Sequence, residues 1–425
     1  MNILWIIGED MGPQLGCYGY PLVQTANLDR LASQGVRFTR AFTTAPVCSA
    51  ARSAWNTGMY QTSIGAHHHR SHRKDGYTLP QGVDLVSRRL RSHGYFTANV
   101  REIAPGLKVN GKTDFNFTVP DAFEGTHWRE RRKDQPFFAQ INFQETHKGP
   151  AFIEARKQQT RVDPAKVPLP PYYPDHPVVR DEFANYLDAM NLLDRKVGTV
   201  LKMLDDEGLA ANTAVFFFGD NGRCLIRGKQ WLYDAGIHIP LLVRWPGVTK
   251  PGTVREDPVS SIDIPATAMA MAGLALPSNM HGQVMLGPGA KRRDHIFAAR
   301  DRCDDTVDRI RCIRTSRYKL IRNFMPERPY TQANKYIETQ YPTLGVMKKL
   351  HGEGKLNDTQ ALFMQPRKPE YELYDVVADP HEVRNLADAP RHKKAFQELS
   401  PKLESWIEES NDQGRLPEQE SARQL

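Results

Sequence analysis

Short apolar runs bounded by turn residues alternate with amphipathic stretches along the first two thirds of the chain. Such runs are typical of strands buried in a parallel sheet, and apolar positions at helical spacing indicate helices that cover it. We expect buried strands at 2–8, 95–100, 137–143, 214–218 and 239–244. We expect helices at 27–34, 50–57, 83–92, 262–272 and, as the longest, 181–207. This alternation predicts an α/β fold with a large, mainly parallel sheet sandwiched by helices.

The pattern changes near residue 294, where strand-like pieces follow each other closely without helices between them. We expect these strands at 295–299, 310–315, 318–323 and 372–376, followed by a helix at 391–409. This order predicts an antiparallel sheet with a helix packed on it. We therefore expect a main domain at 1–293 and a smaller α+β subdomain at 294–425.

The composition is that of an ordinary globular protein, with 40% hydrophobic and 25% charged residues among 425. The formal charge of +8 is compatible with a polyanionic partner and equally with solubility alone. No nucleic-acid-binding motif accompanies this charge, and no apolar run is long enough to span a membrane. Five cysteines without metal-site spacing predict no disulfide framework. The chain opens on a core strand rather than a signal peptide, which leaves a cytoplasmic protein or, if a leader has been removed, a periplasmic or secreted one.

Acidic residues follow two of the predicted strands directly. The first strand ends in Gly8-Glu9-Asp10, and the strand at 214–218 ends in Gly219-Asp220-Asn221-Gly222. Because the carboxyl ends of parallel strands meet at one sheet edge, the two pairs are expected to converge. Three carboxylates and an amide oxygen suit Ca²⁺ or Mg²⁺ better than zinc. Either pair alone could simply cap a helix or turn.

A cysteine and an arginine lie four positions apart where a predicted helix begins. Cys48 precedes the helical segment and Arg52 follows one turn later, so both side chains fall on one helix face. A helix N-terminus beside an arginine forms an anion pocket around position 48. The plainer alternative is a buried, inert cysteine, which is the common fate of a single Cys.

Together these motifs resemble the type I sulfatases of the alkaline phosphatase superfamily. The segment Cys48-Ser49-Ala50-Ala51-Arg52 matches the signature C-x-A/P-x-R, whose cysteine is oxidised to formylglycine by a maturase. Further similarity lies in Thr25–Ala32 (family TPNLDRLA), Thr57-Gly58, Asp220-Asn221-Gly222, Glu372–Asp375, Asp379–Glu382 and Asn385-Leu386. Within the family, the segment Asn323–Pro326 and the long insertion before Glu372 are most similar to the N-sulfoglucosamine sulfohydrolases.

The resemblance implies roles for residues on both sides of Cys48. The implied metal, Ca²⁺ or alternatively Mg²⁺ or Mn²⁺, would be held by Glu9, Asp10, Asp220, Asn221 and position 48. Glu9 departs from the aspartate that is usual there. Arg52 would stabilise the nucleophile, Asp220 would help to deprotonate it, and His147 and Lys229 would hold the sulfate oxygens.

One family motif is absent where it is expected. After the strand at 95–100 the family has GKxH, whereas this chain has Arg101-Glu102-Ile103-Ala104. Lys112 is our preferred replacement for the missing lysine. The missing histidine could come from the loop that contains His67, His68, His69 and His72.

The implied substrates are sulfated sugars or glycosaminoglycans, cleaved at S–O or S–N bonds. We expect the substrate rim to include the proline-rich loop 164–177, where six prolines predict irregular structure. Expected sugar contacts are His69, Arg70, His72 and Arg302. Two alternatives remain open: a phosphonate monoester or phosphodiester hydrolase of the same superfamily, and a non-catalytic polyanion-binding homologue.

Overall fold

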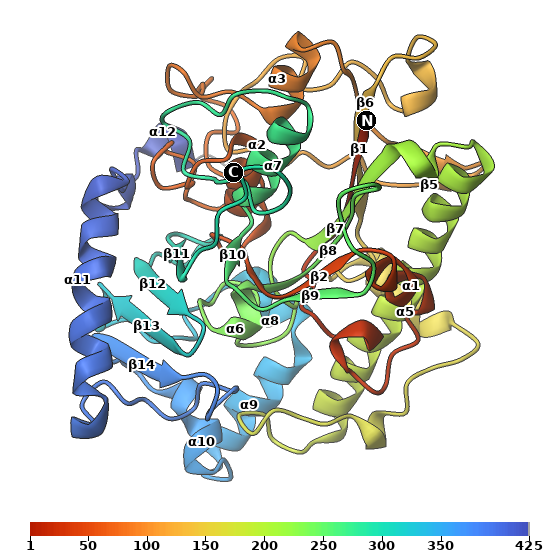
Figure 1. Ribbon diagram of the computed structural model, residues 1–425. Coiled ribbons are helices and arrows are strands. Elements are labelled where there is room, and N and C mark those ends of the chain that lie inside the picture. Colours follow the sequence, from red (N-terminus) through yellow and green to blue (C-terminus); the bar gives the residue numbers. More distant parts are fainter. Residues whose placement is uncertain (424–425) are drawn as a thin grey trace.

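The computed structural model describes residues 1–423 and is built around an eight-stranded sheet (Figure 1). The strands run in the order β10-β2-β8-β7-β1-β6-β3, with β9 beside β2. They are β1 (Asn2–Gly8), β2 (Val36–Phe42), β3 (Phe96–Asn99), β6 (Phe137–Phe143), β7 (Thr213–Gly219), β8 (His238–Arg244), β9 (Thr253–Arg255) and β10 (Val259–Ser260). Every pairing is parallel except those of β8, which is antiparallel to both β2 and β7. The expected mainly parallel sheet is confirmed.

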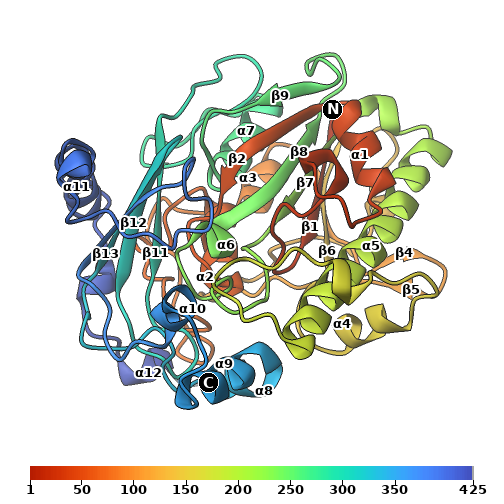
Figure 2. The same ribbon diagram turned by 90° about the horizontal axis from the view of Figure 1, so that it is seen from below.

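Both faces of the sheet are covered by helices, as Figure 2 shows from below. In β1, Leu4 and Ile6 belong to the apolar cluster on the side of α1 (Ala26–Ser33) and α5 (Pro177–Asp206). The alternate residues of β1 belong to the cluster on the other side. The helices there are α2 (Cys48–Thr57), α3 (Val86–Ser92) and α7 (Asp263–Met271). Because successive side chains of a strand point to opposite faces, a strand apolar throughout must be covered twice.

A second sheet follows in the C-terminal part of the chain. Its antiparallel strands are β11 (His295–Arg300), β12 (Ile310–Thr315), β13 (Tyr318–Asn323) and β14 (Tyr371–Asp375), in that order. The long helix α11 (Lys393–Glu409) packs on it through Leu399, Leu403 and Trp406 (Figure 1). This arrangement is the one expected from the sequence.

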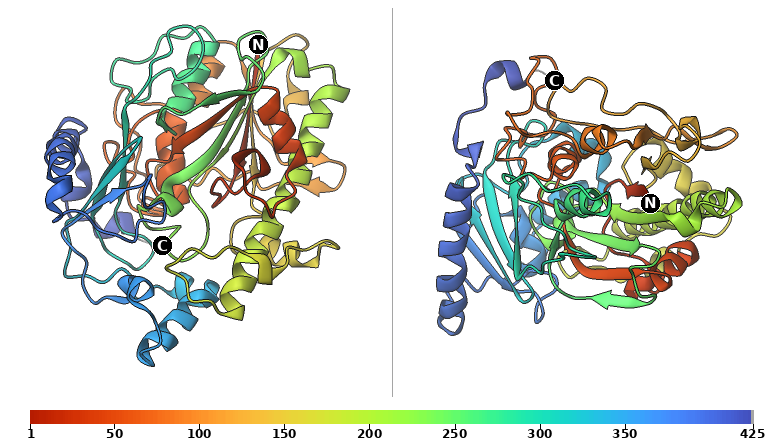
Figure 3. Two further views of the ribbon diagram at one scale, coloured as in Figure 1. Left: turned by 60° about the horizontal axis from the view of Figure 1, so that its bottom comes forward. Right: turned by 45° about the horizontal axis from the view of Figure 1, so that its top comes forward.

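The insertion between β13 and β14 contains helices that apolar spacing alone did not predict. They are α8 (Lys335–Gln340), α9 (Pro342–Gly352) and α10 (Asp358–Ala361). These light-blue helices lie beside the N-terminal part of α5, where Glu182 accepts hydrogen bonds from the amide and hydroxyl of Thr343 (Figure 3). The insertion therefore reaches back onto the main domain.

The smaller elements complete the described chain. They are the hairpin β4 (Glu102–Ala104) and β5 (Leu107–Lys108), and the short helices α4 (Pro150–Glu154), α6 (Asp234–Ile237) and α12 (Glu420–Arg423). The proline-rich segment 164–177 is largely irregular, although Pro164–Lys166 form a 3-10 turn and Pro177 begins α5. In the described part of the chain, no helix combines the length and apolar composition needed to cross a membrane.

Candidate active site

The two acidic pairs meet at the carboxyl edge of the main sheet. Gly8 at the end of β1 is in register with Gly219 at the end of β7, so the residues that follow each glycine are neighbours. The backbone N–H of Asp10 donates to Asp220 Oδ1 at 2.8 Å, and Asn221 Nδ2 donates to Asp10 Oδ1 at 3.0 Å. The convergence expected from strand order is therefore present.

Each carboxylate of this cluster faces a cationic side chain, buried for Lys229 and Arg52 and half-buried for Lys112. Lys112 Nζ lies 3.0 Å from Glu9 Oε2, Lys229 Nζ lies 2.8 Å from Asp10 Oδ2, and Arg52 Nη2 lies 3.0 Å from Asp220 Oδ2. Burial acts to raise the pKa of Asp10, but the charges of Lys229 and His147 outweigh it and lower the pKa to about 2. For Asp220, burial outweighs Arg52 and the pKa is raised. In this structure the three carboxylates are therefore neutralised by lysine and arginine side chains of the protein itself.

The donor set fits a hard divalent cation. Asn221 Oδ1 is buried and has no hydrogen-bond partner, although it stands beside Asp10 and Asp220. A buried amide oxygen without a partner is costly, and a cation would satisfy it. Within residues 1–423, no group of three or more His, Cys, Asp and Glu side chains is arranged to hold a metal ion. The carboxylates of the acidic cluster contact Lys112, Lys229 and Arg52 instead.

Cys48 is the first residue of α2, immediately beside this cluster. The preceding residue, Val47, is extended, so the chain turns into the helix at the cysteine. The thiol is fully buried. Burial acts to raise its pKa, but the charges of Lys112 and Lys229 outweigh burial and lower it. Arg52, one turn later, bonds Asp220 with Nε at 3.1 Å, which links the helix to the acidic cluster.

Lys112, the expected replacement for the lysine missing after β3, lies at the acidic cluster. Glu102 and Ala104 lie in the β4–β5 hairpin, where Glu102 is exposed and accepts a bond from the Gly106 amide. The chain then returns toward the sheet edge, and Lys112 reaches Glu9. Asp114, two residues on, lies 3.4 Å from Lys112 Nζ.

His69, one of the four histidines named as candidates from the sequence, lies beside Cys48. Its Nε2 lies 3.8 Å from Cys48 Sγ, and its Nδ1 lies 2.9 Å from Asp304 Oδ1. Burial acts to lower the pKa of His69, but hydrogen bonds to Asp304 and Cys48 outweigh burial and raise it. His68 instead accepts a bond from the Arg302 amide. From the sequence, Asp304 was expected only as the end of the polar segment 300–304 at the substrate rim, and its pairing with His69 was not predicted.

His147 and Lys229 both lie beside Asp10. His147 Nε2 lies 3.7 Å from Asp10 Oδ2 with its side chain 21% exposed. Burial and the nearby charge of Lys229 lower its pKa to about 4. Tyr336 of α8 places its ring 5.5 Å from Lys229 Nζ and 6.3 Å from the His147 ring. The position of Tyr336 near this site was not predicted from the sequence, because the insertion that contains it was used only as evidence for the family branch.

The four expected sugar contacts lie in different places: His69 and Arg70 lie near Cys48, His72 lies elsewhere, and Arg302 is buried. Arg70 is exposed, and its amide donates to Ser49 Oγ at 2.8 Å, next to Cys48. His72 is held elsewhere, by Asp75 at 2.6 Å and by the Tyr77 ring.

The expectation for Arg302 is wrong. Its side chain is 1% exposed, and it is ion-paired with Glu418 at 2.6 and 2.7 Å. It also donates to the carbonyl of His69 at 3.1 Å. A charge that is neutralised inside the protein has no free donor for a sugar. Arg302 instead fastens the loop that carries His69.

Comparison with protein families identifies this arrangement. The model described as Sulfatase matches residues 1–117 and 108–274, and the model described as N-sulphoglucosamine sulphohydrolase, C-terminal, matches 225–336. The chain belongs to the sulfatase family of the alkaline phosphatase superfamily.

Individual relatives agree with this assignment. An ulvan-active sulfatase of Formosa agariphila is 34% identical over 472 residues, which cover 100% of this chain and 77% of the relative. The N-sulphoglucosamine sulphohydrolase of Homo sapiens is 25% identical, covering 97% of this chain and 90% of the relative. An enzyme solved with its substrate D-glucosamine-2-N,6-O-disulfate superposes with a TM-score of 0.69 at 17% identity, covering 98% and 99% of the two chains. That last likeness concerns the fold.

Proposed function

We propose that this protein hydrolyses sulfate esters or sulfamates of sulfated sugars, with a formylglycine made from Cys48 as nucleophile. The observation that carries the proposal is the position of Cys48. It lies at the start of α2, with Arg52 on the same face and Lys112, Lys229 and His69 around it. Such a surround of cations fits an anionic group that reacts at position 48.

The converted residue, once hydrated, supplies one hydroxyl that attacks sulfur and a second whose deprotonation expels sulfate. Arg52 and Asp220 orient position 48, since they are bonded to each other beneath the start of α2. Lys112 and Lys229 neutralise the sulfuryl oxygens, and His147 stands by the leaving group. His69, held by Asp304, accepts the proton in the second step.

The acidic cluster is proposed as the metal site. Glu9, Asp10, Asp220 and Asn221 would hold Ca²⁺, or alternatively Mg²⁺ or Mn²⁺, which would supply Lewis-acid stabilisation at position 48. Asn221 Oδ1, buried without a partner, supports this assignment. The lysines that now neutralise Glu9 and Asp10 would then face the substrate anion instead.

Sulfated saccharides are the substrate class that the comparisons favour. The relatives carry ulvan and N-sulphoglucosamine in their names, and a solved neighbour holds a disulfated glucosamine. The exposed Arg70 beside Cys48 and the formal charge of +8 suit a polyanionic chain. The presence of Lys112 and His69 in place of the absent motif weighs against a non-catalytic homologue.

The test begins with the mass of the tryptic peptide that contains position 48, from protein made with and without a maturase. Conversion should lower the mass by about 18 Da relative to cysteine. Converted protein should then release sulfate from a sulfated disaccharide and from p-nitrophenyl sulfate. A much greater turnover of a phosphonate monoester would assign the site to phosphonate hydrolysis instead. An unconverted, inactive protein would favour the polyanion-binding alternative.

A further inference from the structure

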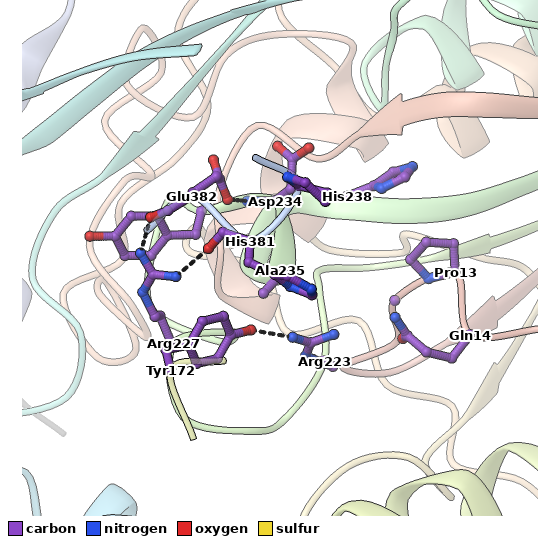
Figure 4. A pocket seen from close by; sticks show the side chains of 13 residues that line it. Pro13, Gln14, Tyr172, Arg223, Arg227, Asp234, Ala235, His238, His381 and Glu382 are labelled. Carbon is purple, nitrogen blue, oxygen red and sulfur yellow. Dashed lines mark hydrogen bonds between the residues drawn. The ribbon is translucent and has the colours of Figure 1, made fainter. Parts of the chain in front are cut away.

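A polar cavity of about 200 Å³ lies where the loops after β1 and β7 meet the segment that follows β14 (Figure 4). It is formed by the loops after β1 and β7, the start of β8, and residues 380–382. None of the residues assigned above to the metal, the nucleophile or the sulfate oxygens lines it. The cavity is therefore separate from the candidate active site and has no role in the proposed reaction.

Arg223 gives this cavity a charge that the protein does not neutralise. Its side chain is 8% exposed, and in the described chain it forms no ion pair within 4.0 Å. Within the described chain, its guanidinium makes one hydrogen bond, from Nη2 to the Tyr172 hydroxyl at 2.5 Å, and lies 5.5 Å from the centre of the Phe183 ring. Its Nε is buried without a hydrogen-bond partner. A guanidinium has five N–H donors, and leaving a buried charge unpaired is unfavourable.

The second arginine of the cavity, Arg227, shows the contrast. It also lacks an ion pair among residues 1–423, but its guanidinium donates to the carbonyls of His381 at 2.6 Å and Glu382 at 2.5 Å. It further stacks over the rings of Tyr233, at 3.8 Å, and Tyr172, at 4.6 Å. The guanidinium of Arg227 is thus held by two backbone carbonyls and forms part of the cavity wall. The guanidinium of Arg223 retains N–H donors without an acceptor.

The acids that line the cavity do not serve as counter-ions for Arg223. Asp234 is paired with Arg314 at 2.9 Å and with Lys319 at 2.5 Å. Glu382 is paired with the same Lys319 at 2.6 Å. Both carboxylates are therefore already neutralised, and the positive charge of Arg223 is left for a molecule that enters the cavity.

Neutral donors surround Arg223. Figure 4 shows Tyr172 bonded to it, and His381 and Gln14 line the same cavity. The His381 side chain lines the cavity, and its partial burial together with the charge of Arg223 lowers its pKa. Gln14 Oε1 accepts a hydrogen bond from the Tyr186 hydroxyl at 3.3 Å, and no residue of the described chain accepts one from its Nε2.

We propose that this cavity binds a sulfate-sized oxyanion, anchored by Arg223 and completed by His381, Gln14 and Tyr172. Its volume of about 200 Å³ is sufficient for a tetrahedral oxyanion. The anion could be free inorganic sulfate or a sulfate group carried by a saccharide. Both sources offer the same tetrahedral oxygens to the guanidinium.

The test uses selenate, a sulfate analogue whose selenium gives an anomalous signal in crystals. Wild-type crystals soaked in selenate should show a peak beside Arg223 and a separate peak at the candidate active site. In Arg223→Gln the first peak should disappear while the second remains. As a control, Arg317→Gln changes an arginine whose side chain is 61% exposed and pairs with Asp375, and it should leave both peaks. His381→Ala, which removes only an exposed ring, should weaken the first peak even if Arg223→Gln does not fold.

Calorimetry in solution gives the affinity and the source of the anion. Selenate should titrate two sites in the wild type and one in Arg223→Gln, with affinity for the lost site reduced at least about tenfold. If the anion is a sulfate group of the substrate, Arg223→Gln should lower kcat/KM for a sulfated oligosaccharide but not for an aryl sulfate. If kcat/KM is unchanged for both substrates, the anion bound in the cavity is free sulfate. The proposal would be overturned if selenate occupied the candidate active site of the crystals but not the cavity. It would also be overturned if the peak beside Arg223 remained in Arg223→Gln. Selenate beside Arg223 with none at Cys48 would contradict the proposed function and leave this cavity site standing.

Discussion

His69 faces Cys48 with one ring nitrogen and Asp304 with the other, at 3.8 Å and 2.9 Å. Asp304 also accepts a hydrogen bond from Gln230 Nε2 at 3.0 Å, so the carboxylate is held from two sides. The histidine is therefore oriented toward position 48 before any substrate arrives. Three distant parts of the chain therefore meet beside position 48.

Replacing His69 with Ala should lower kcat by about 100- to 10,000-fold, the usual contribution of a positioned acid or base. Because the attack on sulfur precedes its proposed role, rapid-quench measurements should show a burst of leaving group followed by slow sulfate release. Asp304→Asn should give a smaller loss of the same form. His68→Ala is the matched control, since that ring bonds the Arg302 amide instead. Equal slowing of both phases would remove His69 from the second step.

Cys48→Ala should abolish turnover and leave the fold intact, because no other side chain can form the covalent intermediate. Thermal unfolding and sulfate release would be measured on the same preparation. Cys312→Ala changes another buried cysteine, in β12, and should keep its activity with a stability loss of about 1 kcal/mol. Turnover above background in Cys48→Ala would refute the central assignment.

Chelation should remove activity, and added Ca²⁺ should restore it. A cation that binds only the folded state also stabilises it, by about 2.7 kcal/mol at one hundred times its dissociation constant. Ca²⁺ should therefore raise the melting temperature of the wild type but have little effect on Asp220→Ala or Asn221→Ala. Full activity after dialysis against EDTA would show that the acidic cluster is not a metal site.

Arg70 and Arg302 should behave differently although both were expected to touch sugar. Arg70→Ala should lower kcat/KM for a sulfated oligosaccharide more than for a small aryl sulfate, since contacts remote from sulfur act only when the sugar is present. Arg302→Ala should reduce both alike and destabilise the fold by about 3 to 5 kcal/mol, because it leaves Glu418 without its partner. Substrate-selective loss in Arg302→Ala would return it to the rim.

The ion pair between Arg302 and Glu418 should also make stability depend on pH. Burial acts to raise the pKa of Glu418, but the hydrogen bonds from Arg302 outweigh it and lower the pKa. A lowered pKa contributes stability above the ordinary value of 4.5 and loses it as pH falls through the folded-state value. The difference in unfolding free energy between wild type and Glu418→Gln should be full at pH 7 and shrink below pH 4.5. Glu409→Gln, at an exposed position, should show no such trend. A difference that stays constant through the acid range would argue against the linkage.

The sequence by itself determined the layered fold and the convergence of the acidic pairs. The apolar runs of β1, β6 and β7 have only one favourable environment, a sheet covered on both faces, and residues after parallel strands necessarily share an edge. Strand β2 was not predicted, because Arg37, Thr39 and Arg40 interrupt its apolar positions. Its placement depends on pairing with β8, which no local pattern reveals.

Only the tertiary structure decided which of the many charged residues enter the site. His69 and Asp304 are 235 positions apart, and Tyr336 arrives from an insertion. From the sequence alone, Arg302 is expected at the surface. It is buried because its guanidinium pairs with Glu418. The burial of a charge depends on a partner that the chain brings from elsewhere, and the free energy of that pairing exists only once the fold has formed.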